Sequence, residues 1–135
     1  MNTDLIDIKI RAVEGGVTAA AGFKAAGIHA GFRKNPERLD YALVVPDKPC
    51  PGAGVFTTNR FCAAPVQVSR ANLGGADKGY GIIAGVSVNS GNANAATGET
   101  GLACARETCN IASQVIGCEP QQILVASTGV IGQIL

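Results

Sequence analysis

The sequence is short of several residue types on which many active sites depend. It has one histidine, His29, no tryptophan, and only 4% aromatic residues among 135. A zinc site that needs two or three imidazoles therefore cannot be built from these residues alone. The five cysteines form no Cys-x-x-Cys pair, which excludes a thioredoxin-like or zinc-finger thiol set.

Charge is also scarce, and no run of apolar residues is long. Charged residues make up 16% of the chain, and 11 basic against 10 acidic residues leave a formal net charge of +1. The basic residues are scattered, which argues against nucleic acid or a membrane surface as a partner. No stretch approaches the roughly 18 apolar residues of a membrane span, and residues 1–7 lack the features of a signal peptide. We expect a cytoplasmic protein with reduced thiols that binds small molecules or another protein chain.

Apolar residues and glycine are plentiful. The 47% of hydrophobic residues is too high for a disordered chain, and the 18 glycines are nearly twice the usual share of about 7%. Short strand patterns outnumber helical ones, and no linker divides the chain. Residues 1–135 therefore predict a single α+β unit, with mixed, strand-rich sheets covered by helices.

Local patterns place the expected elements. One helix is clear over residues 98–116, with Thr97 as N-cap and Gly117 at its end, because apolar residues recur every three or four positions. The segment 18–32 shows no decisive periodicity, and three prolines make residues 46–51 a rigid connection. Strands are expected at residues 5–10, 41–45, 55–58, 66–68, 80–88 and 123–126.

The asparagine-rich segment 89–95 joins the expected long strand to the helix. Its short polar residues suit a simple turn. Its place before a helix N-terminus also suits a ligand site, where three uncharged amides would orient a substrate. Composition alone does not separate these two interpretations.

Residues 127–132, Ser-Thr-Gly-Val-Ile-Gly, follow a second apolar strand. They fit a strand end with a glycine turn. They also fit an oxyanion hole, in which the Gly129 N–H and the Thr128 hydroxyl would be the two donors that an acyl-transfer enzyme needs. His29 as a general base for a serine or cysteine is the less favoured interpretation, and no cysteine has an activating partner nearby in sequence.

Several motifs, in one order along the chain, resemble the ornithine acetyltransferase (glutamate N-acetyltransferase) family of arginine biosynthesis. The resemblance runs from about Gly15 to the last residue and is most specific in its two late motifs. The motifs are Gly15-Gly16-Val17-Thr18, residues 22–27, Gly54-Val55-Phe56-Thr57-Thr58-Asn59, Ala64-Pro65-Val66, residues 88–95 and residues 127–132.

The resemblance implies an acetyl shuttle within a layered α/β/β/α architecture. Family members move an acetyl group from N-acetylornithine to glutamate, and bifunctional members also use acetyl-CoA. The precursor cleaves itself at an Ala-Thr bond into α and β chains, and the new N-terminal threonine of the β chain is the nucleophile. The resemblance also implies that these chains assemble as α2β2. Thr128 and Gly129 match the family's oxyanion hole. No resident cofactor or metal is implied.

The chain also departs from the family pattern. Family α chains continue past the position of Leu135, through further substrate-contacting residues, to the cleavage site. The only Ala-Thr bond here, Ala96-Thr97, lies within the asparagine-rich motif, so we interpret Thr97 as a helix cap. We therefore expect the N-terminal portion of an α chain that is completed by a β chain and is inactive alone. The alternatives are a self-processing aminopeptidase or amidohydrolase of related fold and a non-catalytic assembly domain.

Overall fold

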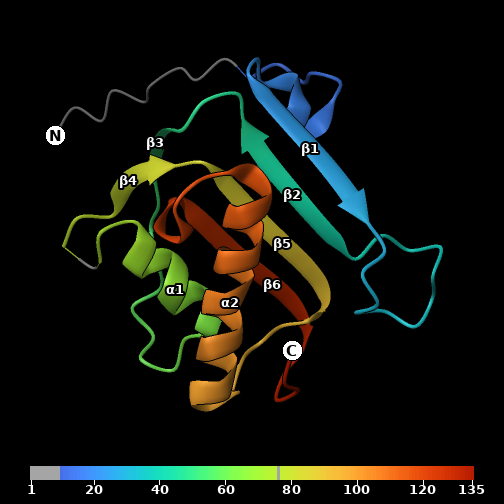
Figure 1. Cartoon of the computed structure of the whole chain (residues 1–135), viewed down its shortest axis with the longest axis vertical. Helices are drawn as coiled ribbons and strands as arrows, with labels where there is room; N and C mark the ends of the chain where they lie inside the picture. The colour runs from blue at the N-terminus through green and yellow to red at the C-terminus, as the bar shows by residue number, and fades with distance from the viewer. Residues whose placement is uncertain (1–9, 76) are drawn as a thin grey trace, which may run out of the picture.

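The computed structural model describes residues 10–75 and 77–135 as strands and helices joined by short loops (Figure 1). Two α-helices and two short 3-10 helices accompany six strands within the described residues. In chain order the elements are η1 (Gly16–Ala19), β1 (Phe23–Ile28), β2 (Tyr41–Pro46), β3 (Cys50–Ala53), α1 (Ala64–Asn72), β4 (Tyr80–Ile83), β5 (Gly85–Asn92), α2 (Gly98–Ile116), η2 (Pro120–Gln122) and β6 (Ile123–Val130).

The main sheet has four strands in the order β1-β2-β5-β6. The pairs β1–β2 and β2–β5 are antiparallel, whereas β5 and β6 are parallel and are connected through α2. Strands β3 and β4 form a separate antiparallel pair. The predicted mixed, strand-rich α+β fold is confirmed.

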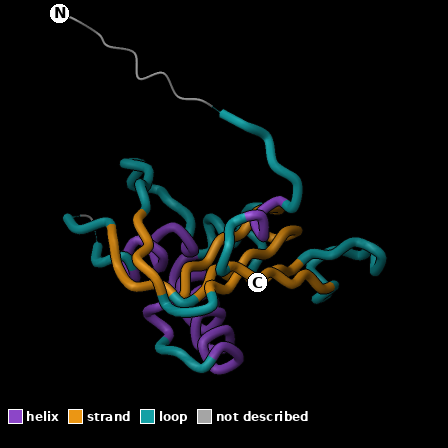
Figure 2. Tube along the Cα trace, turned by 90° about the horizontal axis from the view of Figure 1, so that it is seen from above, coloured by secondary structure: helices purple, strands orange, loops and turns teal. Residues whose placement is uncertain are grey.

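The helices lie on one face of the main sheet, over β5 and β6. Figure 2 shows α2 on one side of the strands, and α1 packs against both α2 and β6. The core between them is built from small and medium apolar side chains, which lets the helices approach the sheet closely. Its buried members are Ala64, Val68, Ala105, Cys109, Ala112, Ile123 and Val125.

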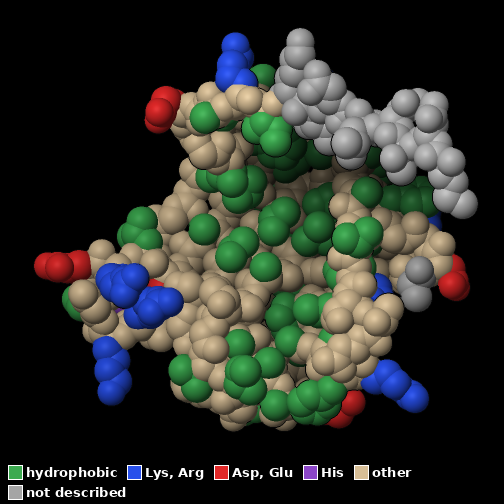
Figure 3. Space-filling model, turned by 180° about the vertical axis from the view of Figure 1, so that it is seen from behind, with side chains coloured by type: hydrophobic (Ala, Val, Ile, Leu, Met, Phe, Trp, Pro, Cys, Tyr) green, Lys and Arg blue, Asp and Glu red, His purple; other side chains and the backbone are tan. Residues whose placement is uncertain are grey.

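The opposite face of the sheet carries apolar side chains with no covering layer among the described residues. Cross-strand register aligns Val44 with Val86, and Val86 with Leu124, on this face. All three remain partly exposed. Figure 3 shows hydrophobic side chains spread over this side of the molecule. We call this surface, made by Ala42, Val44, Val86, Val88, Leu124 and Ala126, the open face.

Several predicted elements agree with the structure. The strand at residues 41–45 is confirmed as β2, and the strand at 123–126 is the first half of β6. The helix at 98–116 is confirmed with both bounds, and Gly117 ends it in the left-handed conformation, at φ 81°. Thr97 stands at the predicted N-cap but does not bond a helix N–H. Its Oγ1 donates instead to Asn94 Oδ1, at 2.8 Å.

Other predictions were wrong. Residues 66–68 lie in α1 rather than in a strand, and residues 55–58 form a loop. The segment 80–88 is two strands in different sheets, and the proline-rich connection contains β3. The strand expected at 5–10 falls on residues 5–9, which lie outside the described residues, and Ile10 is in no strand. None of the helices in the described ranges has the length and hydrophobicity needed to cross a bilayer.

Candidate functional site

The two motifs that the sequence singled out lie side by side at the ends of β5 and β6. Ser90 is aligned with Thr128, and Gly91 with Gly129. The register then shifts, so that Asn92 opposes both Thr128 and Val130 in a bulge-like irregularity. Such irregularities re-aim the chain at the end of a strand and are common next to active sites.

Gly129 has a backbone conformation that only glycine adopts readily. Its φ is 137°, and a Cβ at this position would collide with the backbone of Gly91 and Asn92. Gly129 is exposed, so its backbone is accessible from solvent.

Thr128 lies on the open face of the sheet. Alternation along β6 buries Ile123 and Val125 against the helices and turns Leu124, Ala126 and Thr128 the other way. Thr128 is exposed. The strand end therefore presents an accessible hydroxyl next to an accessible glycine backbone. Their role as oxyanion donors stays a prediction.

The asparagines of the neighbouring motif are engaged within the chain. Asn89 donates from Nδ2 to the Asn92 carbonyl at 2.8 Å, and Asn92 donates to the Gln133 and Ile134 carbonyls at 3.0 and 3.3 Å. Asn94, which is 1% exposed, donates to the Gly101 carbonyl at 2.8 Å. These buried amides hold the turn between β5 and α2, so the structure favours the turn interpretation over substrate orientation.

His29 braces a loop, in agreement with the structural role that the sequence favoured. Its Nδ1 lies 3.2 Å from Asp40 Oδ2 and 3.1 Å from the Arg38 carbonyl. Asp40 is buried and accepts N–H groups from Ala30 at 2.6 Å and Arg33 at 2.8 Å. Burial alone would raise the pKa of Asp40, but these hydrogen bonds and nearby His29 outweigh it and hold the pKa below its usual value.

The five cysteines are free, and two have thiols that are harder to ionise than usual. Burial raises the pKa of Cys109 to about 11, although a hydrogen bond from Asn72 works against this shift. Burial and then the charge of Glu119 raise the pKa of Cys118. Neither thiol has the lowered pKa of a reactive nucleophile.

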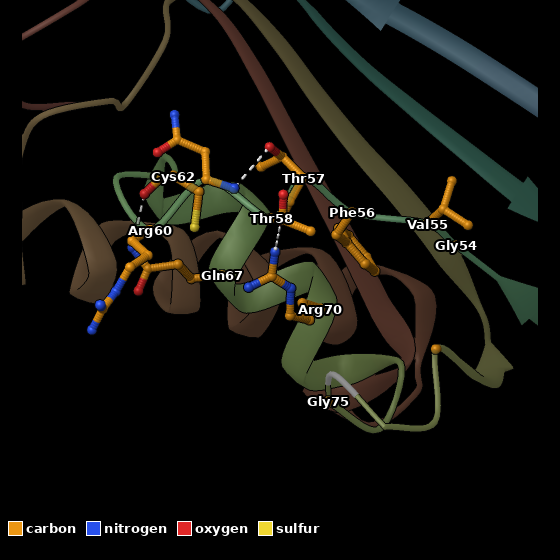
Figure 4. A pocket seen from close by; sticks show the side chains of 12 residues that line it. Gly54, Val55, Phe56, Thr57, Thr58, Arg60, Cys62, Gln67, Arg70 and Gly75 are labelled. Carbon is orange, nitrogen blue, oxygen red and sulfur yellow. Dashed lines mark hydrogen bonds between the residues drawn. The ribbon is translucent and has the colours of Figure 1, made fainter.

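A hollow of about 590 Å³ beside α1 was not foreseen from the sequence (Figure 4). It is bounded by the loop 54–62, which we predicted to be partly a strand. Arg70 donates from Nη2 to the Thr57 carbonyl at 2.6 Å and lies 5.5 Å from the centre of the Phe56 ring. The guanidinium thus shapes the loop that borders the hollow. Asn59 was the sequence signal for a turn in this loop, because its side chain accepts the Phe61 N–H at 2.9 Å.

The fold defines a mixed α+β protein in which the ends of β5 and β6 bring together an exposed threonine hydroxyl and an exposed glycine backbone. Comparison with known proteins makes the assignment specific. The model of the ArgJ family matches residues 24–135, and the chain belongs to this family. The resemblance expected from the sequence is confirmed.

The relatives and solved structures agree with one another. The arginine biosynthesis bifunctional protein ArgJ of Dehalococcoides mccartyi is 46% identical over 88% of this chain and 28% of its own length. The ArgJ of Bifidobacterium longum is 49% identical over 88% of this chain and 29% of its own length. The chain therefore spans little more than a quarter of the curated relatives that it matches.

Two crystal structures share the fold. ArgJ from Bacillus halodurans has a TM-score of 0.80 at 36% identity, over 90% of this chain and 60% of that one. Ornithine acetyltransferase from Mycobacterium tuberculosis, complexed with ornithine, has a TM-score of 0.75 at 39% identity, over 89% of this chain and 62% of that one.

Proposed function

We propose that this chain is part of the α chain of a glutamate N-acetyltransferase that takes its acetyl group from N-acetylornithine. The observation that carries the proposal is the exposed Thr128–Gly129 pair, held in a glycine-only conformation at the end of β6. Membership of the ArgJ family and the fold shared with an ornithine acetyltransferase support it. We extend the proposal to acetyl-CoA as a second donor, since the relatives are named bifunctional.

In the proposed reaction, the nucleophile is a threonine that lies outside this chain. Its hydroxyl oxygen attacks the acetyl carbonyl of N-acetylornithine, and its own α-amine takes the hydroxyl proton. The carbonyl oxygen becomes an oxyanion, which accepts hydrogen bonds from Thr128 Oγ1 and the Gly129 N–H. The C–N bond then breaks, and ornithine leaves with the proton. The amine of glutamate attacks the carbonyl of the remaining acetyl-threonine ester and forms a new C–N bond. The ester C–O bond then breaks, the threonine oxygen recovers a proton from the attacking amine through the α-amine, and N-acetylglutamate leaves.

Two exposed apolar surfaces of this chain support the proposal of a partner chain. The open face is apolar, and an apolar groove of about 530 Å³ lies between α2 and strands β1 and β2. We propose that a β chain from the same precursor completes the fold in an α2β2 enzyme, which acts in the cytoplasm without nucleic acid or membrane. The same stretch covers about three fifths of each solved chain but little over a quarter of the curated sequences, as expected if precursors are cleaved.

The test replaces Thr128 by Ala in the complete enzyme. Losing one oxyanion donor should lower kcat by about 10²–10³-fold and leave KM for N-acetylornithine nearly unchanged. Thr100→Ala, an exposed threonine on α2, is the matched control and should retain full activity. Unchanged acetyl transfer in the Thr128 variant would reject the assignment.

A second assay separates transfer from hydrolysis. Release of ornithine should depend on glutamate and follow a ping-pong pattern, with an acetylated threonine trapped on the partner chain. Release that is independent of glutamate would instead identify a self-processing amidohydrolase.

A further inference from the structure

A buried carboxylate lies outside the donor pair but is connected to it by contacts. Asp40, which is 2% exposed, immediately precedes β2. Its Oδ1 accepts the Ala30 N–H and its Oδ2 accepts the Arg33 N–H, at 2.6 and 2.8 Å. These two bonds fix the loop 30–33 at both of its ends. A carboxylate suits this position because both of its oxygens can only accept when it is ionised.

The fixed loop lies against the end of β5. Arg33 donates from Nε to Ser90 Oγ at 3.1 Å, and the Ser90 N–H donates to the Asp40 carbonyl at 2.8 Å. The loop and the strand are thus tied together by a side chain and by the backbone. The backbone of Phe32 closes the remaining space, because a Cβ on Gly91 would lie 2.8 Å from the Phe32 oxygen.

Gly91 contacts Phe32 on one side and Gly129 on the other. The two glycines are aligned across β5 and β6, both with positive φ, at 113° and 137°. Their backbones approach so closely that no side chain fits on Gly129. Any shift of Gly91 would therefore move Gly129, because the two backbones are in close contact with no space between them.

We propose that Asp40 is a positioning residue for the oxyanion hole, acting through the loop 30–33 and Gly91 on the direction of the Gly129 N–H. This inference rests on the proposed function of Thr128 and Gly129. Asp40 touches no reacting atom. It holds in place the backbone that supports one of the two donors, as outer contacts commonly do for catalytic groups.

The test uses the complete enzyme with Asp40→Asn. The amide keeps the shape of the side chain but presents an NH2 group to one of two backbone donors, so the loop loses a bond. We expect kcat to fall by about 10–10²-fold, since small misplacements of catalytic groups cost this much, with KM changed less than about twofold. Asp47→Asn, which removes the exposed partner of Lys24, is the control and should leave both constants unchanged.

A double-mutant cycle with Thr128→Ala distinguishes positioning from general structural damage. If Asp40 acts on the Gly129 donor of the same oxyanion hole, the two substitutions should be coupled, so that the loss in the double variant differs from the product of the single losses. Fully multiplicative losses, an effect on KM alone, or an unchanged kcat would each overturn the inference.

Ser90→Ala provides a second variant if the Asp40 variant does not fold, since it removes only the link to Arg33. It should lower kcat in the same direction, and an unchanged kcat would overturn the inference. If Thr128→Ala lowers kcat while Asp40→Asn and Ser90→Ala do not, the positioning role fails and the proposed function stands. If Thr128→Ala has no effect, the proposed function fails and the positioning role with it.

Discussion

Gly91 and Gly129 show how two residues without side chains can determine the shape of a site. Each has a positive φ, and neither has room for a Cβ. The close backbone contact lets the ends of β5 and β6 meet without an intervening side chain. Gly129 therefore presents its backbone to solvent at a fixed place relative to Thr128.

Cys109 offers a prediction at the same scale. Its thiol is buried in the core, and burial raises its pKa to about 11. Below that pH the thiol stays protonated, and only the thiolate reacts with alkylating reagents. Treatment of the folded protein with iodoacetamide at pH 8, followed by peptide mass spectrometry, should leave Cys109 unmodified.

Cys62 serves as the internal reference because it is partly exposed, whereas Cys109 is buried. It should be alkylated under the same conditions. In denaturant, all five cysteines should react. Alkylation of Cys109 in the folded protein at the rate of Cys62 would contradict the buried environment.

The position of Thr128 and Gly129 at the end of a strand could be predicted because an apolar strand followed by a hydroxyl residue and a glycine is a local pattern, whereas their role as donors stays a prediction. The alignment of Gly91 with Gly129 could not be predicted, because register between strands separated by a helix depends on packing. Burial of the asparagines was missed for a similar reason. Their composition suits a turn and a ligand site equally, and only the contacts of Asn92 and Asn94 decide between them.

At the scale of elements, α1 protects the outer edge of β6. Ser69 Oγ donates to the Val125 carbonyl at 2.8 Å and accepts the Val125 N–H at 2.9 Å. Asn72 donates from Nδ2 to the Ile123 carbonyl at 2.7 Å. These side chains replace the missing neighbouring strand, and an edge that is covered in this way cannot pair with another chain.

We predict that Ser69→Ala destabilises the protein by about 1–3 kcal/mol, because it leaves a buried backbone N–H and a buried carbonyl without their partner. Thermal unfolding of the complete enzyme, followed by circular dichroism, should show a lower midpoint. Thr100→Ala removes an exposed hydroxyl from α2 and should leave the midpoint unchanged. Equal midpoints for both variants would show that the Ser69 bonds contribute little.

The two helices differ in how well they could be predicted. Helix α2 is 19 residues long with a regular apolar stripe, so periodicity alone gives both of its ends. Helix α1 has nine residues, and the short alternation at residues 66–68 imitates a strand. Its helical state depends on burying Ala64 and Val68, four residues apart, against β6 and α2, which the local pattern does not reveal.

At the scale of the whole molecule, the open face is the side of the main sheet that no other described element covers. One side of the sheet is covered by helices, whereas the other exposes a band of valine and leucine (Figure 3). Apolar patches of this kind mark interaction sites in soluble proteins. Thr128 lies at the end of this face, so a partner that covered the valines, as we propose, would also lie over Thr128.

We predict that Val86→Asp prevents assembly of the complete enzyme, because Val86 lies at the centre of the open face and a charge there would be buried without a partner. Co-purification of the tagged chain with the remainder of the enzyme should be lost. Val17→Asp, at an exposed apolar position in η1, is the control and should assemble normally. Normal assembly of the Val86 variant would show that the partner lies elsewhere.

The parallel pair β5–β6 and its connecting helix α2 also have a consequence for the order of synthesis. The unit occupies one continuous stretch, from Gly85 to Val130, and both members of the donor pair lie within it. The loop 30–33 and β2, which contact the end of β5, also precede this unit in the chain. On the ribosome, the donors would thus take shape before the downstream threonine proposed as nucleophile has been translated. In the proposed precursor, the two residues that we propose as oxyanion donors would therefore be in place before the segment to be cleaved is synthesised.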